Sequence, residues 1–171
     1  MSMRSYFYTG YGFSVAKVKD LTILKALLNH KETLHKLTNF PIDCLHTMYE
    51  KNKNNDCFHF EDMDNEDFDK IEGTFSNISN NDYEIEDPSF YFELFACIME
   101  KETGIGFYYY EGQDDTGSEP TIMLTQKMPW FFSEKERNLT KEECTNILFK
   151  YAEELGLTKD YIGEEEVEYF G

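Results

Sequence analysis

Aromatic side chains are unusually numerous in this chain, and they decide which classes of fold are open to it. The 171 residues include 15 Phe, 12 Tyr and 1 Trp, against a formal net charge of −18. Strongly charged chains that lack aromatic residues stay disordered, whereas each ring buries roughly 150–250 Å² when it packs into a core. A chain of this length buries roughly 70% of its unfolded surface. We therefore expect a single domain over residues 1–171 that needs neither a disulfide nor a metal ion to fold.

The negative charge is concentrated in the last two thirds of the chain. Residues 1–60 carry eight Lys and Arg and five Asp and Glu, whereas residues 61–171 carry eight and 29. This asymmetry suggests two sub-regions, a near-neutral to basic helical part over 1–60 and an acidic sheet-and-helix part over 61–171. A surface of this sign repels polyphosphate, so we expect no direct binding to DNA or RNA and a basic protein as the partner.

The helices are predicted from apolar spacing and from capping residues. Asp20 precedes a helical pattern that continues to about residue 37, and Pro41 suits the first position of a shorter helix. Another short helix is expected near 65–72. The clearest helix is the last, because Thr140 and Glu143 form a capping box at its start and Gly156 provides a left-handed stop.

Two segments predict strands at the beginning and in the middle of the chain. Residues 5–9 and 12–18 are rich in β-forming residues on either side of Gly10 and Gly12, which predicts a hairpin. Residues 89–99 are apolar on both alternating faces, which favours a central strand. Periodicity alone does not exclude a buried helix for the same run.

Three further segments complete the predicted sheet. One strand opens at Gly104–Gly106 and runs through Tyr110, a second covers 121–128, and a last one is expected over 164–170. The fold class is therefore α+β. We expect an antiparallel sheet, built from the N-terminal hairpin and a three-stranded meander, to be packed by about three to four helices.

Two Cys-x-His units are the candidate metal ligands. Cys44 with His46 and Cys57 with His59 supply the ligand types of a tetrahedral zinc site. Their spacing differs from the Cys-x-x-Cys turn that lets two thiolates converge. We therefore favour ordinary cysteines and surface histidines, and we expect no metal and no cofactor. The alternative is a metal site at these four residues.

No motif of the sequence points to catalysis. Asp115-Thr116-Gly117 matches the short signature of aspartic proteases, but hydrophilic residues precede it, where the protease needs a buried apolar strand. A polar hairpin tip explains the same residues. We therefore predict that the protein is not an enzyme and assign no catalytic residue.

The sequence also lacks the patterns of export and membrane insertion. No window contains 18 apolar residues, and the first residues show no signal-peptide core. We expect no membrane association and a cytoplasmic location in which the four cysteines are reduced.

The candidate partner-binding residues are clustered carboxylates together with two aromatic residues. If the tail is extended, alternate glutamates share one face about 6.6 Å apart, which is the scale of successive phosphates in a nucleic-acid strand. Tyr and Trp provide good contact residues at protein interfaces. The candidates are Asp62, Asp64, Glu66, Asp67, Asp69, Glu84, Glu86, Asp87, Glu164, Glu165, Glu166, Glu168, Trp130 and Tyr109.

In size and composition the chain resembles small acidic proteins that inhibit nucleic-acid enzymes. These include phage anti-CRISPR and anti-restriction proteins that mimic DNA, and immunity proteins that block toxic nucleases. The resemblance covers no motif. It implies a non-enzymatic inhibitor that binds the basic nucleic-acid channel of a nuclease or another defence protein. The alternative is an acidic protein–protein adaptor or assembly subunit that uses an aromatic contact surface and whose charge only keeps it soluble.

Overall fold

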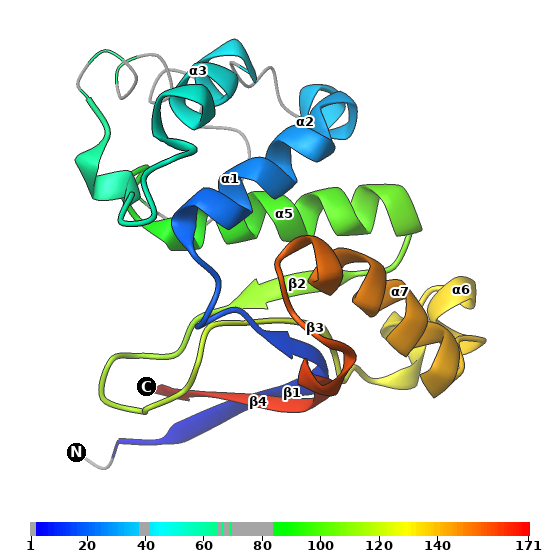
Figure 1. Cartoon of the computed structure of the whole chain (residues 1–171). Helices are drawn as coiled ribbons and strands as arrows, with labels where there is room; N and C mark the ends of the chain where they lie inside the picture. The colour runs from blue at the N-terminus through cyan, green and yellow to red at the C-terminus, as the bar shows by residue number, and fades with distance from the viewer. Residues whose placement is uncertain (1–2, 38–41, 65, 67–68, 70–83) are drawn as a thin grey trace. The chain divides into compact units, whose positions relative to one another are not determined.

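The computed structural model describes residues 3–37, 42–64, 66, 69 and 84–171. The chain divides into two compact units (Figure 1). The sheet unit combines Met1–Val18 with Thr103–Gly171, and the helical unit is Lys19–Glu102. The sheet unit carries eight Lys and Arg against fifteen Asp and Glu, and the helical unit carries eight against nineteen. Both units are therefore acidic, and the division suggested after residue 60 falls inside the helical unit.

The sheet unit is built on four antiparallel strands in the order β2-β3-β1-β4. They are β1 (Ser5–Ser14), β2 (Phe107–Tyr110), β3 (Thr121–Thr125) and β4 (Ile162–Phe170). The α+β class with an antiparallel sheet is thereby confirmed, as are the strands expected before Tyr110, after Thr121 and over 164–170.

The predicted N-terminal hairpin is wrong, because residues 5–14 form one continuous strand. Gly10 and Gly12 do not turn the chain. They let β1 approach β3, since a Cβ on Gly10 would stand 2.3 Å from the carbonyl oxygen of Leu124 and one on Gly12 would stand 2.0 Å from that of Ile122. The glycines mark a close approach between two backbones, which is the other use of glycine in a strand.

The two long strands extend beyond the rest of the sheet. β1 pairs with β3 only over Gly10–Ser14, but it pairs with β4 along Ser5–Phe13. The first half of β1 and the second half of β4 therefore form a two-stranded ribbon (Figure 1).

Helix α7 (Lys141–Glu154) covers β1 and β4 within the sheet unit. Its predicted capping box between Thr140 and Glu143 is confirmed, and Gly156 has the expected positive φ of 76°. The Tyr11 hydroxyl lies 2.9 Å from Thr145 Oγ1, which ties β1 to the helix. The remaining short elements of this unit are η3 (Pro129–Phe131), α6 (Glu134–Arg137) and η4 (Lys159–Tyr161).

The helical unit contains α1 (Asp20–Asn29), α2 (Lys31–Leu37), α3 (Ile42–Asn52), η1 (Phe60–Asp62) and α5 (Pro88–Thr103), the last of which ends one residue beyond it. The helix expected over residues 20–37 is divided near His30 into α1 and α2. The helix expected near 65–72 lies largely outside the described residues. The described residues form six α-helices in all, two of them of seven residues or fewer, against the three to four expected.

The central strand predicted over 89–99 is wrong, because this run belongs to α5. The helix buries Phe90, Tyr91, Leu94, Phe95 and Ile98, which lie on several sides of its axis. A helix that is buried nearly all round has no polar face, so its sequence does not show the period of 3.6 residues that distinguishes an amphipathic helix from a strand.

Candidate partner-binding surface

Strand β4 brings three of the predicted glutamates to one face of the sheet. Its residues alternate between the two faces, so Glu164, Glu166 and Glu168 lie together, about 6.6 Å apart in succession. Their cross-strand partners on β1 are Tyr11, Thr9 and Phe7 respectively. The result is a row of carboxylates beside a row of aromatic and hydroxyl side chains.

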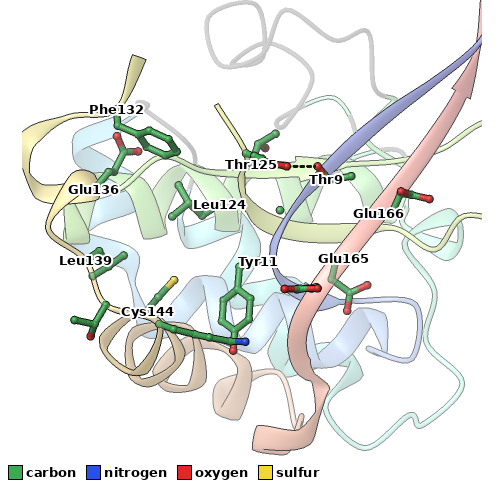
Figure 2. Close-up of a pocket in the computed structure, with 15 residues that line it drawn as sticks. Thr9, Tyr11, Leu124, Thr125, Phe132, Glu136, Leu139, Cys144, Glu165 and Glu166 are labelled. Atoms are coloured by element: carbon green, nitrogen blue, oxygen red, sulfur yellow. Dashed lines mark hydrogen bonds between the residues drawn. The ribbon is translucent and has the colours of Figure 1, made fainter. Parts of the chain in front are cut away.

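This face of β4 borders a groove of about 700 Å³ (Figure 2). Figure 2 shows Glu165 and Glu166 on the β4 side, with Phe132 and Leu139 on the opposite side. Tyr11 and Leu124 lie between the two sides. The groove therefore combines an acidic wall with an apolar floor, an arrangement suited to a basic side chain that has a long apolar stem.

The carboxylates of the β4 row are not neutralised within the sheet unit. Among the described residues no cation lies within ion-pair distance of Glu164, Glu166 or Glu168. Lys141, the cation of the groove lining, lies over the Tyr11 ring with its Nζ 5.4 Å from the ring centroid. Such carboxylates attract an external cation, because their own chain does not satisfy them.

One groove carboxylate has a different role. The carboxylate of Glu136 accepts hydrogen bonds from the backbone N–H of Ser133 at 2.7 Å and of Gly106 at 3.0 Å, and Lys127 Nζ lies 3.2 Å away. Burial raises the pKa of Glu136, but these hydrogen bonds outweigh it and hold the pKa below its usual value. Glu136 is therefore a structural anion between α6 and the start of β2.

Glu165 also belongs to the groove lining, although strand alternation places its side chain on the other face of β4 from Glu164 and Glu166. It lines a second cavity of about 270 Å³ with Ser14, Lys17, Glu119, Asp160 and Tyr161. Burial and the nearby Glu119 raise the pKa of Glu165. Of the four predicted tail glutamates, the structure thus places three on one face and the fourth on the opposite face.

The other predicted carboxylates belong to the helical unit. Asp62, Asp64, Glu66 and Asp69 are exposed, Asp67 lies outside the described residues, and Asp64 Oδ2 is 3.2 Å from Lys51 Nζ.

The second carboxylate cluster of the helical unit precedes α5. Glu84 and Glu86 are exposed. Asp87 Oδ1 accepts a hydrogen bond from the backbone N–H of Ser89 at 2.9 Å, so this carboxylate supports the first turn of α5.

The structure separates the two predicted aromatic contacts. Trp130 is 73% exposed and lies in η3 next to exposed Met128 and Phe131. Tyr109 is only 6% exposed, and its neighbour Tyr108 is the one that reaches the surface of β2. Strand alternation places one of these two tyrosines inside and the other outside, but the sequence does not show which. Sequence reasoning also missed the exposed Tyr6, Phe7 and Tyr8 of the ribbon, because the predicted hairpin would have paired them.

The cysteines and histidines of the described residues are not grouped as a metal site. Within the described residues none of the four cysteines forms a disulfide, and Cys44 is buried whereas Cys57 is exposed. In the described part of the chain, no group of three His, Cys, Asp or Glu residues is placed to hold a metal ion. Within the same residues, no helix has both the length and the apolar character needed to cross a membrane.

Comparisons with known proteins provide no function for this chain, so a functional proposal must be based on the geometry of its surface. No family model matches the chain, and no curated protein or solved structure matches it.

Proposed function

We propose that the protein is a non-enzymatic, cytoplasmic inhibitor that binds the basic nucleic-acid channel of a nuclease or another defence protein. The observation that carries this proposal is the row of Glu164, Glu166 and Glu168 on one face of β4, without a described cation beside it. A channel lined by Lys and Arg for regularly spaced phosphates offers a complementary row of cations.

Charge and apolar surface have separate roles in this proposal. The net charge of −18 speeds the encounter with a basic channel through electrostatic steering. The groove floor at Tyr11 and Leu124 packs against the apolar stems of bound Lys or Arg side chains and slows dissociation. The protein would then exclude DNA or RNA by occupying their site and would have no substrate of its own.

The test begins with capture of partners from host lysate on tagged protein. Washes at low salt and then at about 0.5 M shorten the Debye length from about 10 Å toward 4 Å, which weakens electrostatic contacts. We expect one basic nucleic-acid enzyme to be enriched over an equally acidic control protein. The purified enzyme should then lose its activity in proportion to added protein, and excess DNA or RNA should compete.

A pair of charge-reversal variants locates the contact. Glu164→Lys, Glu166→Lys and Glu168→Lys together should abolish inhibition. The matched control reverses three exposed carboxylates away from the groove, Asp114→Lys, Asp115→Lys and Glu153→Lys, and changes the net charge equally. Equal loss in both variants would mean that only net charge matters, and no loss in either would contradict the proposal.

A second candidate function rests on the exposed aromatic corner. Met128, Trp130 and Phe131 form a neighbouring set of exposed apolar side chains in and beside η3. Such a set suits an adaptor or assembly subunit whose contact is aromatic. Binding through this corner would tolerate salt and the β4 reversals, and it would be lost in a Trp130→Ala, Phe131→Ala variant.

A further inference from the structure

The ribbon has one open main-chain edge, in the first half of β1. Arg4 and Gly171 exchange both backbone hydrogen bonds, at 3.0 and 2.9 Å. The N–H and C=O groups of the even-numbered residues of β1 therefore point toward β4. The N–H and C=O groups of the odd-numbered residues point away from β4. From Thr9 onward the opposite side is occupied, because Gln126 N–H donates to the Thr9 carbonyl at 2.7 Å and β3 follows. The outward N–H and C=O groups of Ser5 and Phe7 have no partner among the described residues.

The corresponding edge of β4 is protected. The N–H of Glu168 donates to Ser118 Oγ, and that of Phe170 donates to Gln113 Oε1, each at 2.9 Å. Glu164 and Glu166 add charge to the remainder of that edge. Proteins commonly use such charges and side-chain caps to prevent strand edges from pairing.

Among the residues that the structure describes, none protects the open edge of β1 in a comparable way. Residues 3–9 contain one cation, Arg4, and no carboxylate, in a chain with 34 acidic residues. Tyr6, Phe7 and Tyr8 are 53%, 52% and 44% exposed. A strand edge with exposed aromatic residues, without proline or an acidic residue, is a template for another strand.

We propose that two copies of this chain pair through their β1 strands, antiparallel and with the two-fold axis at Tyr6. In this register Ser5 of each copy faces Phe7 of the other, so the four open groups on each copy are satisfied by four new hydrogen bonds. The two ribbons would form a four-stranded sheet in the order β4, β1, β1 and β4, which joins the sheets of the two copies. The proposal is independent of the proposed inhibitory function, because it uses a different edge of the ribbon.

The side chains suit this register on the face that carries Tyr6. The two Tyr6 rings would lie directly opposite each other as a cross-strand aromatic pair. Arg4 of each copy would lie opposite Tyr8 of the other, whose ring already stacks on Tyr110 with centroids 5.0 Å apart. A guanidinium beside a held tyrosine ring forms a favourable cation–π contact.

Repulsion between the acidic copies is weak at this edge. The nearest carboxylate of the ribbon is Glu168, which lies on β4 opposite Phe7. In the pair, the strands would be ordered β4, β1, then β1 and β4 of the second copy, so the two Glu168 residues would be at least three strand spacings apart, about 14 Å. That distance exceeds the Debye length of about 8 Å at physiological salt. A second copy is therefore the occupant that fits an acid-free edge, whereas a basic partner would favour β4.

Sedimentation velocity of the purified full chain over a wide concentration range tests the proposal. We expect a monomer–dimer equilibrium in the wild-type protein. Phe7→Pro removes an outward N–H and leaves the β1–β4 hydrogen bonds in place, so it should weaken dimerisation by about 30-fold or more, the factor for two lost main-chain hydrogen bonds. Phe7→Thr keeps the N–H and should weaken it less. A wild-type protein that stays monomeric, or a dimer insensitive to Phe7→Pro, would overturn the proposal.

A mixing experiment tests the two-fold contact at Tyr6 directly. Tyr6→Glu and Tyr6→Lys each place like charges opposite each other and should each be monomeric, whereas Tyr6→Gln should still dimerise. The Glu and Lys variants should associate when mixed, because opposite charges then meet. Failure of this mixture to associate, or dimers formed by either charged variant alone, would show that Tyr6 does not face its own copy. Circular dichroism of each variant verifies that it is folded.

Discussion

Gly12 and Gly163 are direct cross-strand partners in β1 and β4, and only Gly12 has no room for a side chain. A Cβ on Gly12 would meet the Ile122 carbonyl oxygen on the neighbouring strand, whereas a Cβ on Gly163 would meet no atom of the described residues within 4 Å. Gly12 is therefore a requirement for β1 to pair with β3, and Gly163 is not.

This difference predicts opposite outcomes for two identical substitutions. Gly12→Ala should destabilise the protein by about 3 kcal/mol, because the clash is with backbone atoms that cannot move away without breaking the β1–β3 pairing. Gly163→Ala should be neutral or stabilise by about 0.5 kcal/mol, since alanine loses less conformational entropy on folding. Urea denaturation measures both free energies of unfolding, and equal losses would contradict the close approach.

Glu136 should make the stability of the protein depend on acid. Its pKa lies below the usual value because of hydrogen bonds that outweigh burial, so its contribution is present above a pH of about 4.5 and is lost as the pH falls through the lowered pKa. Glu136→Ala should cost about 2 kcal/mol at neutral pH, since the N–H groups of Gly106 and Ser133 lose their acceptor. Denaturation curves as a function of pH measure this, with Glu134→Ala as the exposed control on the same helix. An equal loss in both variants would show that the hydrogen bonds of Glu136 contribute nothing.

Glu93 in α5 predicts the opposite pH dependence. Its Oε2 is buried and has no hydrogen-bond partner among the described residues, and burial raises the pKa of the carboxyl above its usual value. The wild-type protein therefore loses stability as the pH rises through the raised pKa. Glu93→Gln should stabilise the neutral-pH protein by roughly 0.5 kcal/mol, after allowance for the partial exposure of the group, and the gain should vanish in acid. A gain that is equally large at low pH would show that charge is not the cause.

The caps on β4 should be visible in hydrogen exchange. Ser118→Ala together with Gln113→Ala removes the acceptors of the Glu168 and Phe170 N–H groups. Exchange of these two amides should become about fivefold faster, which corresponds to about 1 kcal/mol of lost protection each. The amide of Tyr169 is the internal control, because it faces β1. Equal acceleration of all three amides would indicate fraying of the whole ribbon instead.

The elements that sequence reasoning predicted correctly are those with local signals. Thr140, Glu143 and Gly156 specify the start and the end of α7 by their own hydrogen bonds and φ angle, whatever the rest of the chain does. The alternation of glutamates in β4 likewise follows from the geometry of any extended strand. These parts of the fold and of the candidate surface could be predicted.

The errors concern information that lies in distant contacts. In the sequence Gly10 and Gly12 resemble turn residues, because their close contacts with the Leu124 and Ile122 carbonyl oxygens are known only from the structure. Whether Tyr108 or Tyr109 faces outward depends on the pairing of β2 with β3. The apolar run over residues 89–99 is buried nearly all round as a helix, and its lack of a polar face left the sequence with no periodicity to distinguish a helix from a central strand.

The pairing of β1 with β4 also determines how late in synthesis the sheet can be completed. Ser5 pairs with Phe170, so Ser5 leaves the ribosome about 165 positions before its partner in the ribbon. The helical unit, Lys19–Glu102, is synthesised completely within that interval, and β1 has neither of its neighbouring strands until β3 is made at Thr121–Thr125. Since a nascent strand with exposed aromatic residues is prone to pair with other chains, we expect dilute or chaperone-assisted synthesis to raise the yield of correctly closed sheet.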